Sequence, residues 1–395
     1  MTPRADFSPR VGDIVSNHPL SDERPQAETT KTTPWQSIYV ASLCSFVQAL
    51  QFGLFFSSLW PYLKRLDPTV SESFFGYVVA IYSFGQCIAS PLFGYWSNRI
   101  KQVRMPTIFG LNMMLLGNLI YLMIDTLPTG HRYGMALARV LIGIGSSNGV
   151  LLRAYASTAS LSVDRSRAIG CVTAGIAVGL VIGPGLQALF TPLGEEGIEL
   201  LFGFNVNMYK APALLAAIVN VGGVLMMYFA FEERYAGLKE DEEAKELPSA
   251  DFIAVAVCIV TRFTQLSVST NIETWCESTP HVNFWLYYVT LCFVFESTFA
   301  FSNVVLPTLF SKIIGPRRQG TMQGVFQMSG SLARMVQPVI INIIYAHWGP
   351  RGVWHLEIAQ LGLTLALWVV FLKRLVPLEK REVDPKTDKK ISTIS

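Results

Sequence analysis

The chain has 395 residues, of which 51% are hydrophobic and only 15% are charged, and its mean hydropathy is +0.38. This composition excludes an ordinary soluble protein and places the chain among proteins that cross a membrane several times. The net charge of +3 is small and does not suggest a nucleic-acid partner, and the six cysteines show neither a metal-binding nor a disulfide spacing.

The first part of the chain, residues 1–35, is polar and rich in Pro, Ser and Thr. It is predicted to be a disordered cytosolic tail, and it lacks the pattern of a cleavable signal peptide. The rest predicts an all-α polytopic membrane protein with about ten transmembrane helices. These ten spans are predicted at 36–62, 74–96, 105–125, 134–155, 168–190, 209–231, 251–272, 283–310, 321–345 and 353–372.

Lys and Arg are concentrated in every second connection between these spans and in both termini. The positive-inside rule therefore places both termini in the cytosol. The predicted organisation is an N-terminal six-helix bundle (36–231), an acidic cytosolic linker (232–250), a shortened C-terminal bundle of four helices (251–372) and a basic cytosolic tail (373–395).

A short polar stretch from Gly94 to Arg104 joins the second and third predicted spans. Gly94 permits close approach of helices, Asn98 can cap the following helix, and Arg99 helps to hold the loop in the cytosol. An ordinary positive-inside loop would carry the same charges. The spacing G-x-x-x-N-R-x-x-x-x-R, however, resembles the loop between helices two and three of the major facilitator superfamily, which implies a gating role for Gly94, Asn98 and Arg99.

Polar residues inside the N-terminal spans are candidates for binding a solute. Gln48 lies in the first span, and Arg139, Asn148 and Arg153 lie in the fourth. A guanidinium group cannot be discharged in lipid, so Arg139 is expected to face the interior of the bundle. The alternatives are that Arg139 makes interhelical hydrogen bonds and that Arg153 extends to the cytosolic interface.

The fifth span carries Gly175, Gly179 and Gly183 at a spacing of four residues, followed by Pro184. Such a stripe of glycines in a membrane helix predicts close packing against a neighbour. It also resembles the fifth-helix signature of the same superfamily, G-x-x-x-G-P-x-x-G.

The predicted C-terminal spans hold three charged residues near the middle of the bilayer: Arg262, Glu296 and Arg334. Charge at this depth is costly and predicts a partner or a wet cavity. One interpretation is a structural ion pair between Glu296 and an arginine. The other is a substrate site in which the excess of arginine favours an anion and Glu296 couples transport to protons.

Longer stretches resemble the major facilitator domain-containing protein 8 family, which includes the lysosomal protein of neuronal ceroid lipofuscinosis type seven. They are residues 82–98, 152–155, 311–320 and 345–351. Trp275-Cys276 is similar to the segment before helix ten of that family, yet it follows the seventh span directly. Helices eight and nine are therefore expected to be absent, which gives ten helices instead of twelve.

The resemblance implies a lysosomal membrane transporter that moves or conducts a small anion, either chloride or an organic anion, by alternating access or a channel-like pathway. The alternative is a non-transporting membrane scaffold or an inactive truncated isoform. Expected partners are the lipid bilayer, the anion and a clathrin adaptor that binds Tyr235–Leu238 as a tyrosine-based sorting signal. No cofactor or metal is expected, and the absence of a Walker loop, catalytic triad or HExxH motif argues against an enzyme.

Overall fold

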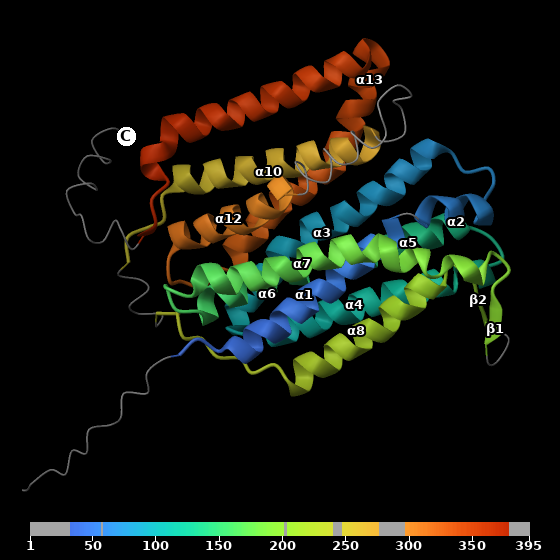
Figure 1. Cartoon of the computed structure of the whole chain (residues 1–395), viewed down its shortest axis with the longest axis horizontal. Coiled ribbons are helices and arrows are strands. Elements are labelled where there is room, and N and C mark those ends of the chain that lie inside the picture. Colours follow the sequence, from blue (N-terminus) through green and yellow to red (C-terminus); the bar gives the residue numbers. More distant parts are fainter. Residues whose placement is uncertain (1–31, 57, 201–203, 240–246, 276–296, 379–395) are drawn as a thin grey trace, which may run out of the picture. The chain divides into compact units, whose positions relative to one another are not determined.

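The computed structural model describes residues 32–56, 58–200, 204–239, 247–275 and 297–378 (Figure 1). Within these residues the protein is almost entirely helical, and the predicted all-α fold is confirmed. The helices are α1 (Trp35–Phe56), α2 (Leu59–Leu66), α3 (Glu72–Ile100), α4 (Arg104–Leu122), α5 (His131–Gly145), α6 (Asn148–Ala159), α7 (Arg165–Ala188), α8 (Ala211–Phe229), α10 (Phe252–Trp275), α12 (Ser297–Ile314) and α13 (Gly320–Phe371). Short 3-10 turns cover Ile124–Thr126, Thr191–Leu193 and Leu372–Arg374, and strands β1 (Ile198–Leu200) and β2 (Phe204–Val206) form an antiparallel hairpin with Ile198 opposite Val206.

Eight helical segments of the described chain are long and apolar enough to cross a membrane. Two predicted spans are interrupted, because 36–62 divides into α1 and α2 and 134–155 divides into α5 and α6. The last two predicted spans are the two halves of α13, which are two helices that meet at a kink at Gly349, where φ is 63°. Only glycine adopts this backbone conformation readily, which explains a sharp bend at this residue.

The predicted span 283–310 is described only from residue 297, where α12 begins. The first part of α13 is not among these eight segments, because it carries a row of polar residues that lowers its hydropathy. These are Gln323, Gln327, Ser331 and Arg334, spaced by four, four and three residues, so they share one face of the helix.

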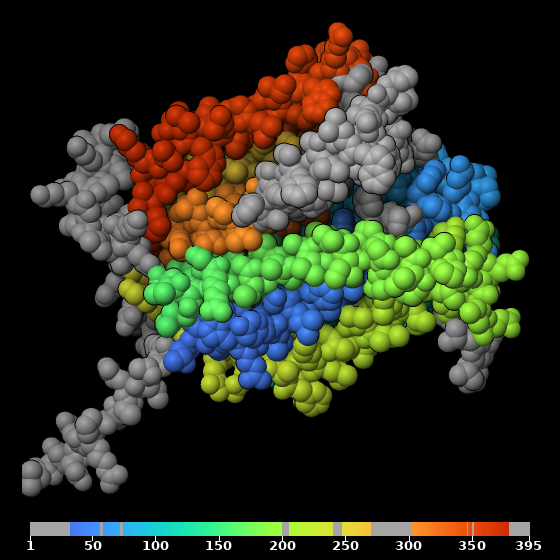
Figure 2. Space-filling view, viewed as in Figure 1, coloured from blue at the N-terminus to red at the C-terminus, as the bar shows by residue number. Residues whose placement is uncertain are grey.

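The glycine face of α7 packs on α1. A Cβ atom added at Gly175 would lie 2.4 Å from the carbonyl oxygen of Ser42, and one added at Gly179 would lie 2.5 Å from that of Phe46. Gly183 packs on Gly53 of α1 in the same way, because a Cβ atom added at Gly183 would lie 2.7 Å from the Cα of Gly53. Figure 2 shows α7 lying between α1 and α12 on this face of the molecule. Pro184 lies within α7, on the lining of the cavity described below.

A buried set of three amide side chains holds α1, α4 and α8 together. Gln51 Nε2 donates to Asn220 Oδ1 at 2.8 Å, and Gln51 Oε1 accepts from Asn118 Nδ2 at 3.2 Å and from Asn220 Nδ2 at 3.1 Å. All three residues are buried, so lipid does not reach their amide groups.

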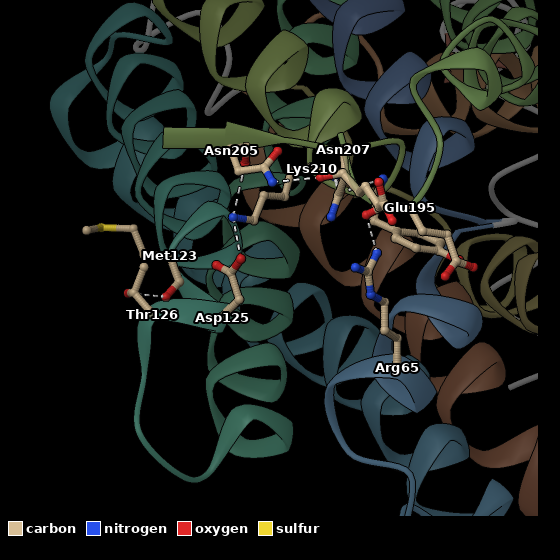
Figure 3. A network of polar contacts seen from close by, with 10 residues as sticks. Arg65, Met123, Asp125, Thr126, Glu195, Asn205, Asn207 and Lys210 are labelled. Atoms are coloured by element: carbon tan, nitrogen blue, oxygen red, sulfur yellow. Dashed lines mark hydrogen bonds and ion pairs between the residues drawn. The ribbon is translucent and has the colours of Figure 1, made fainter. Parts of the chain in front are cut away.

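The hairpin end of the bundle is closed by a separate polar network (Figure 3). Lys210 forms an ion pair with Asp125 and donates to the carbonyl oxygen of Asn205 at 3.2 Å. Arg65 donates to the carbonyl oxygen of Glu195. Asn207 Oδ1 accepts from the backbone N–H of Lys210 at 3.0 Å and so caps the start of α8. These contacts tie the β1–β2 hairpin to α2 and to the turn after α4.

Candidate binding cavity

A cavity of about 370 Å³ lies between helices from the N-terminal and C-terminal parts of the chain. It contains four of the six residues that the sequence predicts to bind a solute: Gln48 of α1, Arg153 of α6, Arg262 of α10 and Arg334 of α13. Its full lining is Ser45, Gln48, Ala49, Phe52, Gly53, Tyr82, Gln86, Ser146, Gly149, Val150, Arg153, Thr173, Ile176, Leu180, Val181, Pro184, Arg262, Leu266, Ser269, Asn303, Gln327 and Arg334.

Arg153 reaches the cavity from the middle of α6, a helix whose residues are almost all buried. Only 6% of its surface is exposed, and its Nη2 donates to Gln327 Oε1 at 2.6 Å. The interpretation in which Arg153 extends to the membrane interface is therefore wrong, because its guanidinium group points into the protein and bonds to α13.

Arg262 is held more firmly than Arg153. Its Nη1 donates to Asn303 Oδ1 at 2.6 Å and to Gln265 Oε1 at 3.0 Å, and its Nη2 lies 3.5 Å from Gln327 Oε1. The guanidinium also lies 5.6 Å from the centre of the Phe326 ring. Neutral amides thus position this side chain, and its charge is not cancelled by them.

Arg334 is half-buried, and its guanidinium carbon lies 6.0 Å from the centre of the Phe52 ring. The Nε atoms of Arg153, Arg262 and Arg334 are all buried and have no hydrogen-bond partner among the described residues. The three side chains are close enough to repel one another. No Asp or Glu occurs among the described residues that line the cavity. An anion would satisfy both the charge and the open donors.

Arg139 and Asn148, the other two predicted solute ligands, do not line this cavity. Arg139 lies behind Tyr82, with its guanidinium carbon 4.6 Å from the centre of that ring. Asn148 faces α4 and donates from Nδ2 to the carbonyl oxygen of Thr107 at 3.0 Å. Tyr82 does line the cavity, so Arg139 contacts the lining through this ring.

The predicted gating loop lies where α3 ends and α13 begins, at what we call the basic end, which carries Arg99, Arg104, Arg165, Arg167 and Arg318. A Cβ atom at Gly94 would lie 2.1 Å from the carbonyl oxygen of Gly320, so the two backbones touch. The sequence suggested that Asn98 caps the helix that follows it, α4, but it does not. Its Oδ1 accepts from the N–H of Gly320 at 3.1 Å and its Nδ2 donates to Thr321 Oγ1 at 2.9 Å, so it caps α13 instead. Arg99 is exposed.

We predict that Asn98→Ala lowers the free energy of unfolding by about 1 kcal/mol, the usual effect of losing a helix N-cap. Asn98→Asp should retain this stability, because a carboxylate can accept from Gly320 and suits the positive end of a helix. Thermal unfolding of the purified variants measures both. Equal stability of the alanine variant and the wild type would show that the cap of α13 contributes nothing.

The segment Tyr235–Leu238 packs on the basic end. The N–H of Gly237 donates to the carbonyl oxygen of Thr158 at 3.1 Å, and a Cβ at this glycine would collide with Ser160. The Tyr235 hydroxyl donates to Glu233, and its ring lies 5.4 Å from the guanidinium carbon of Arg318. Burial raises the pKa of Tyr235, helped by the nearby Glu233 carboxylate.

Sequence reasoning missed several polar residues of the cavity and its surroundings. The sequence does contain a signal for Gln327. Gln323, Gln327 and Ser331 are spaced by four residues and share one helix face with Arg334. Glu357 is a second acid within a span, and its side chain is buried. It lies one turn before Gln360, in a polar row between α10 and the second part of α13. The contacts of this row are Ser267 to Gln360 at 3.0 Å, Thr264 to Thr364 at 2.9 Å and Trp368 to Thr261 at 2.8 Å. Glu296, the predicted proton-coupling residue, lies outside the described residues.

Comparison with known proteins agrees with this fold. The family model of the Major Facilitator Superfamily matches residues 41–305. The Major facilitator superfamily domain-containing protein 8 of Xenopus laevis is 25% identical over 475 aligned positions, which cover 88% of this chain and 93% of that protein. Since the alignment is longer than the chain, that relative holds internal segments with no counterpart here. Multidrug resistance protein 2 of Bacillus subtilis is 30% identical over 58% of this chain and 55% of its own length.

Two solved structures share the fold at low sequence identity. The human organic anion transporter MFSD10 superposes with a TM-score of 0.63, at 16% identity over 84% of this chain and 99% of that chain. The proton:xylose symporter XylE superposes with a TM-score of 0.61, at 14% identity over 85% of this chain and 95% of that chain.

Proposed function

Because the chain belongs to the major facilitator superfamily, a family of membrane transporters rather than enzymes, we propose that it moves or conducts a small anion across the lysosomal membrane. The observation that supports an anion is the meeting of Arg153, Arg262 and Arg334 in one cavity whose described lining contains no acid. Chloride and organic anions both fit this charge, and the route is alternating access or a channel-like path.

The orientation that we propose follows from the basic loops. With the basic end in the cytosol, both termini are cytosolic, and we infer that the contacts of Gly94 and Asn98 with α13 close the cavity on that side. The lysosomal location rests on the family resemblance. Binding of a clathrin adaptor to Tyr235–Leu238 as an extended peptide would require this segment to leave α6, because Gly237 now bonds to Thr158.

Anion flux into liposomes that contain the purified chain tests the proposal. Flux above that of protein-free liposomes, inhibited when Arg153 is changed to Gln, would support it. A folded, monodisperse protein that passes no anion would instead support the alternative, a non-transporting scaffold or inactive truncated isoform. That alternative is favoured by the segments that the Xenopus relative has and this chain lacks.

The proton-coupling role of Glu296 also remains our proposal. We predict that Glu296→Gln removes the dependence of anion flux on luminal pH, because glutamine keeps the shape of the side chain but cannot carry a proton. Glu357→Gln is the matched control, since it makes the same change at a buried acid of the C-terminal spans. Measuring flux at several luminal pH values for both variants decides between them. An unchanged pH dependence in the Glu296 variant would exclude that residue, and a loss in the Glu357 variant would assign the role to the α10–α13 row.

A further inference from the structure

We propose that the cavity binds an organic anion that carries two acidic groups on a compact apolar body, such as a dicarboxylate, in preference to a single halide ion. This inference rests on the proposed anion transport and names the class of substrate that the same site would select.

The first argument is the amount of positive charge. Arg153, Arg262 and Arg334 come from three different helices and share one cavity of about 370 Å³. Their described hydrogen-bond acceptors are neutral: Gln327 for Arg153, and Asn303, Gln265 and Gln327 for Arg262. One bound halide would cancel one of the three charges. Two acidic groups cancel two and reduce the mutual repulsion of the arginines.

The second argument is the number of open donors. Each of the three guanidinium groups keeps a buried Nε–H without a partner among the described residues. Arg153 and Arg262 are also more than nine-tenths buried, so bulk water does not replace a missing acceptor. A carboxylate has two oxygens and matches the planar fork of a guanidinium group, whereas a halide is a single acceptor. Two carboxylates can engage two of these forks together.

The third argument is the apolar part of the cavity lining. It includes Ala49 and Phe52 of α1 and Ile176, Leu180 and Val181 of α7. These side chains offer dispersion contacts to carbon atoms and no charge to an ion. The arginines lie on α6, α10 and α13. A cavity lined by both arginines and apolar side chains suits a solute that combines acidic groups with a carbon body.

The test compares ligands on the whole purified chain. Thermal unfolding is measured with chloride, acetate and succinate at one fixed sodium concentration, because a ligand that binds the folded state raises the unfolding temperature according to its affinity. We expect succinate to bind at least about tenfold more tightly than acetate or chloride, the gain of one additional charge-assisted pair. Flux of the same three anions into liposomes is measured in parallel.

Variants of Arg334 show whether the second carboxylate of succinate pairs with this arginine or responds only to the positive charge of the cavity. Arg334→Gln should weaken the binding of succinate by about tenfold or more while changing the affinity for acetate by less than about threefold, since acetate needs only one guanidinium group. Arg334→Lys, which keeps the charge but loses the fork, should give an intermediate affinity for succinate. Arg234→Gln is the matched control, because Arg234 is exposed and its ion pair with Glu232 lies at the surface.

The possible outcomes distinguish the two proposals. Equal affinity for succinate, acetate and chloride would overturn the preference for a dianion and leave anion transport standing. So would an equal effect of Arg334→Gln on all three. Binding and flux of none of them by a folded protein would overturn anion transport itself. Tighter binding of succinate that depends on Arg334 would support the dianion site.

Discussion

Changing Arg262 to glutamine is expected to reduce anion flux by one to two orders of magnitude. Arg262 is the most fully enclosed of the three cavity arginines, at 3% exposure, and it bonds to Asn303 and Gln265. A hydrogen bond that involves a charged group contributes about 1.5–3 kcal/mol, and each 1.4 kcal/mol corresponds to a factor of ten in binding. The substitution removes such a donor from the anion and lowers the positive charge of the cavity.

The measurement is the initial rate of anion uptake into liposomes, with the amount of folded protein checked by gel filtration. Arg262→Lys should recover part of the rate, because a lysine restores the charge without the planar fork. Arg234→Gln should leave the rate unchanged. A folded Arg262→Gln protein with the wild-type rate would show that the cavity is not on the path of the anion.

A valine at Gly94 is expected to prevent closure of the basic end and to abolish alternating transport. The added Cβ would lie 2.1 Å from the carbonyl oxygen of Gly320 and 2.6 Å from its carbon, and real Cβ atoms essentially never approach other atoms so closely. The obstacle is backbone rather than a side chain that can turn away, so α3 and α13 must separate. Overpacking of this kind typically costs about 1–3 kcal/mol.

Labelling of a cysteine introduced at Ser157 reports this closure. Ser157 is fully buried at the basic end, and its hydroxyl donates to Gln319 Oε1 at 3.2 Å. A water-soluble maleimide should react slowly with Ser157→Cys alone and quickly when Gly94→Val is added. Gly76→Val is the matched control on the same helix, since a Cβ at Gly76 meets nothing within 4 Å. Equal labelling with Gly76→Val and Gly94→Val would contradict a closing contact at Gly94.

Much of the helical architecture can be predicted from sequence because lipid imposes simple rules. A span must be apolar for about 20 residues, and this rule located α3, α4, α7, α8 and α10 closely. It could not predict the turn that separates α5 from α6 or the kink at which the last two spans meet in α13. Those features depend on local backbone geometry at Ser146–Ser147 and Gly349, which hydropathy does not measure.

The cavity was predictable in part. A charge in a membrane span must be sheltered, so Arg153, Arg262 and Arg334 could be selected from sequence alone. Arg139 obeys the same rule, but the ring of Tyr82 provides its shelter outside the cavity. Asn98 shows a second limit, because its partner Gly320 lies 222 residues away along the chain. A capping residue can be recognised locally, but the helix that it caps cannot be identified when the contact is tertiary.

The amide oxygen of Gln327 accepts from Arg153 of α6 at 2.6 Å, and Nη2 of Arg262 lies 3.5 Å from it. If the basic end opens, α6 and α13 move apart, and Gln327 keeps Arg262 while losing Arg153. That bond contributes about 1.5–3 kcal/mol. An empty protein would therefore be open only about a tenth to a hundredth as often as it would be if no bond had to break. A bound anion offers Arg153 a replacement acceptor and removes this penalty. The loaded protein would therefore open far more often than the empty one, which limits futile cycles and leak in the absence of solute.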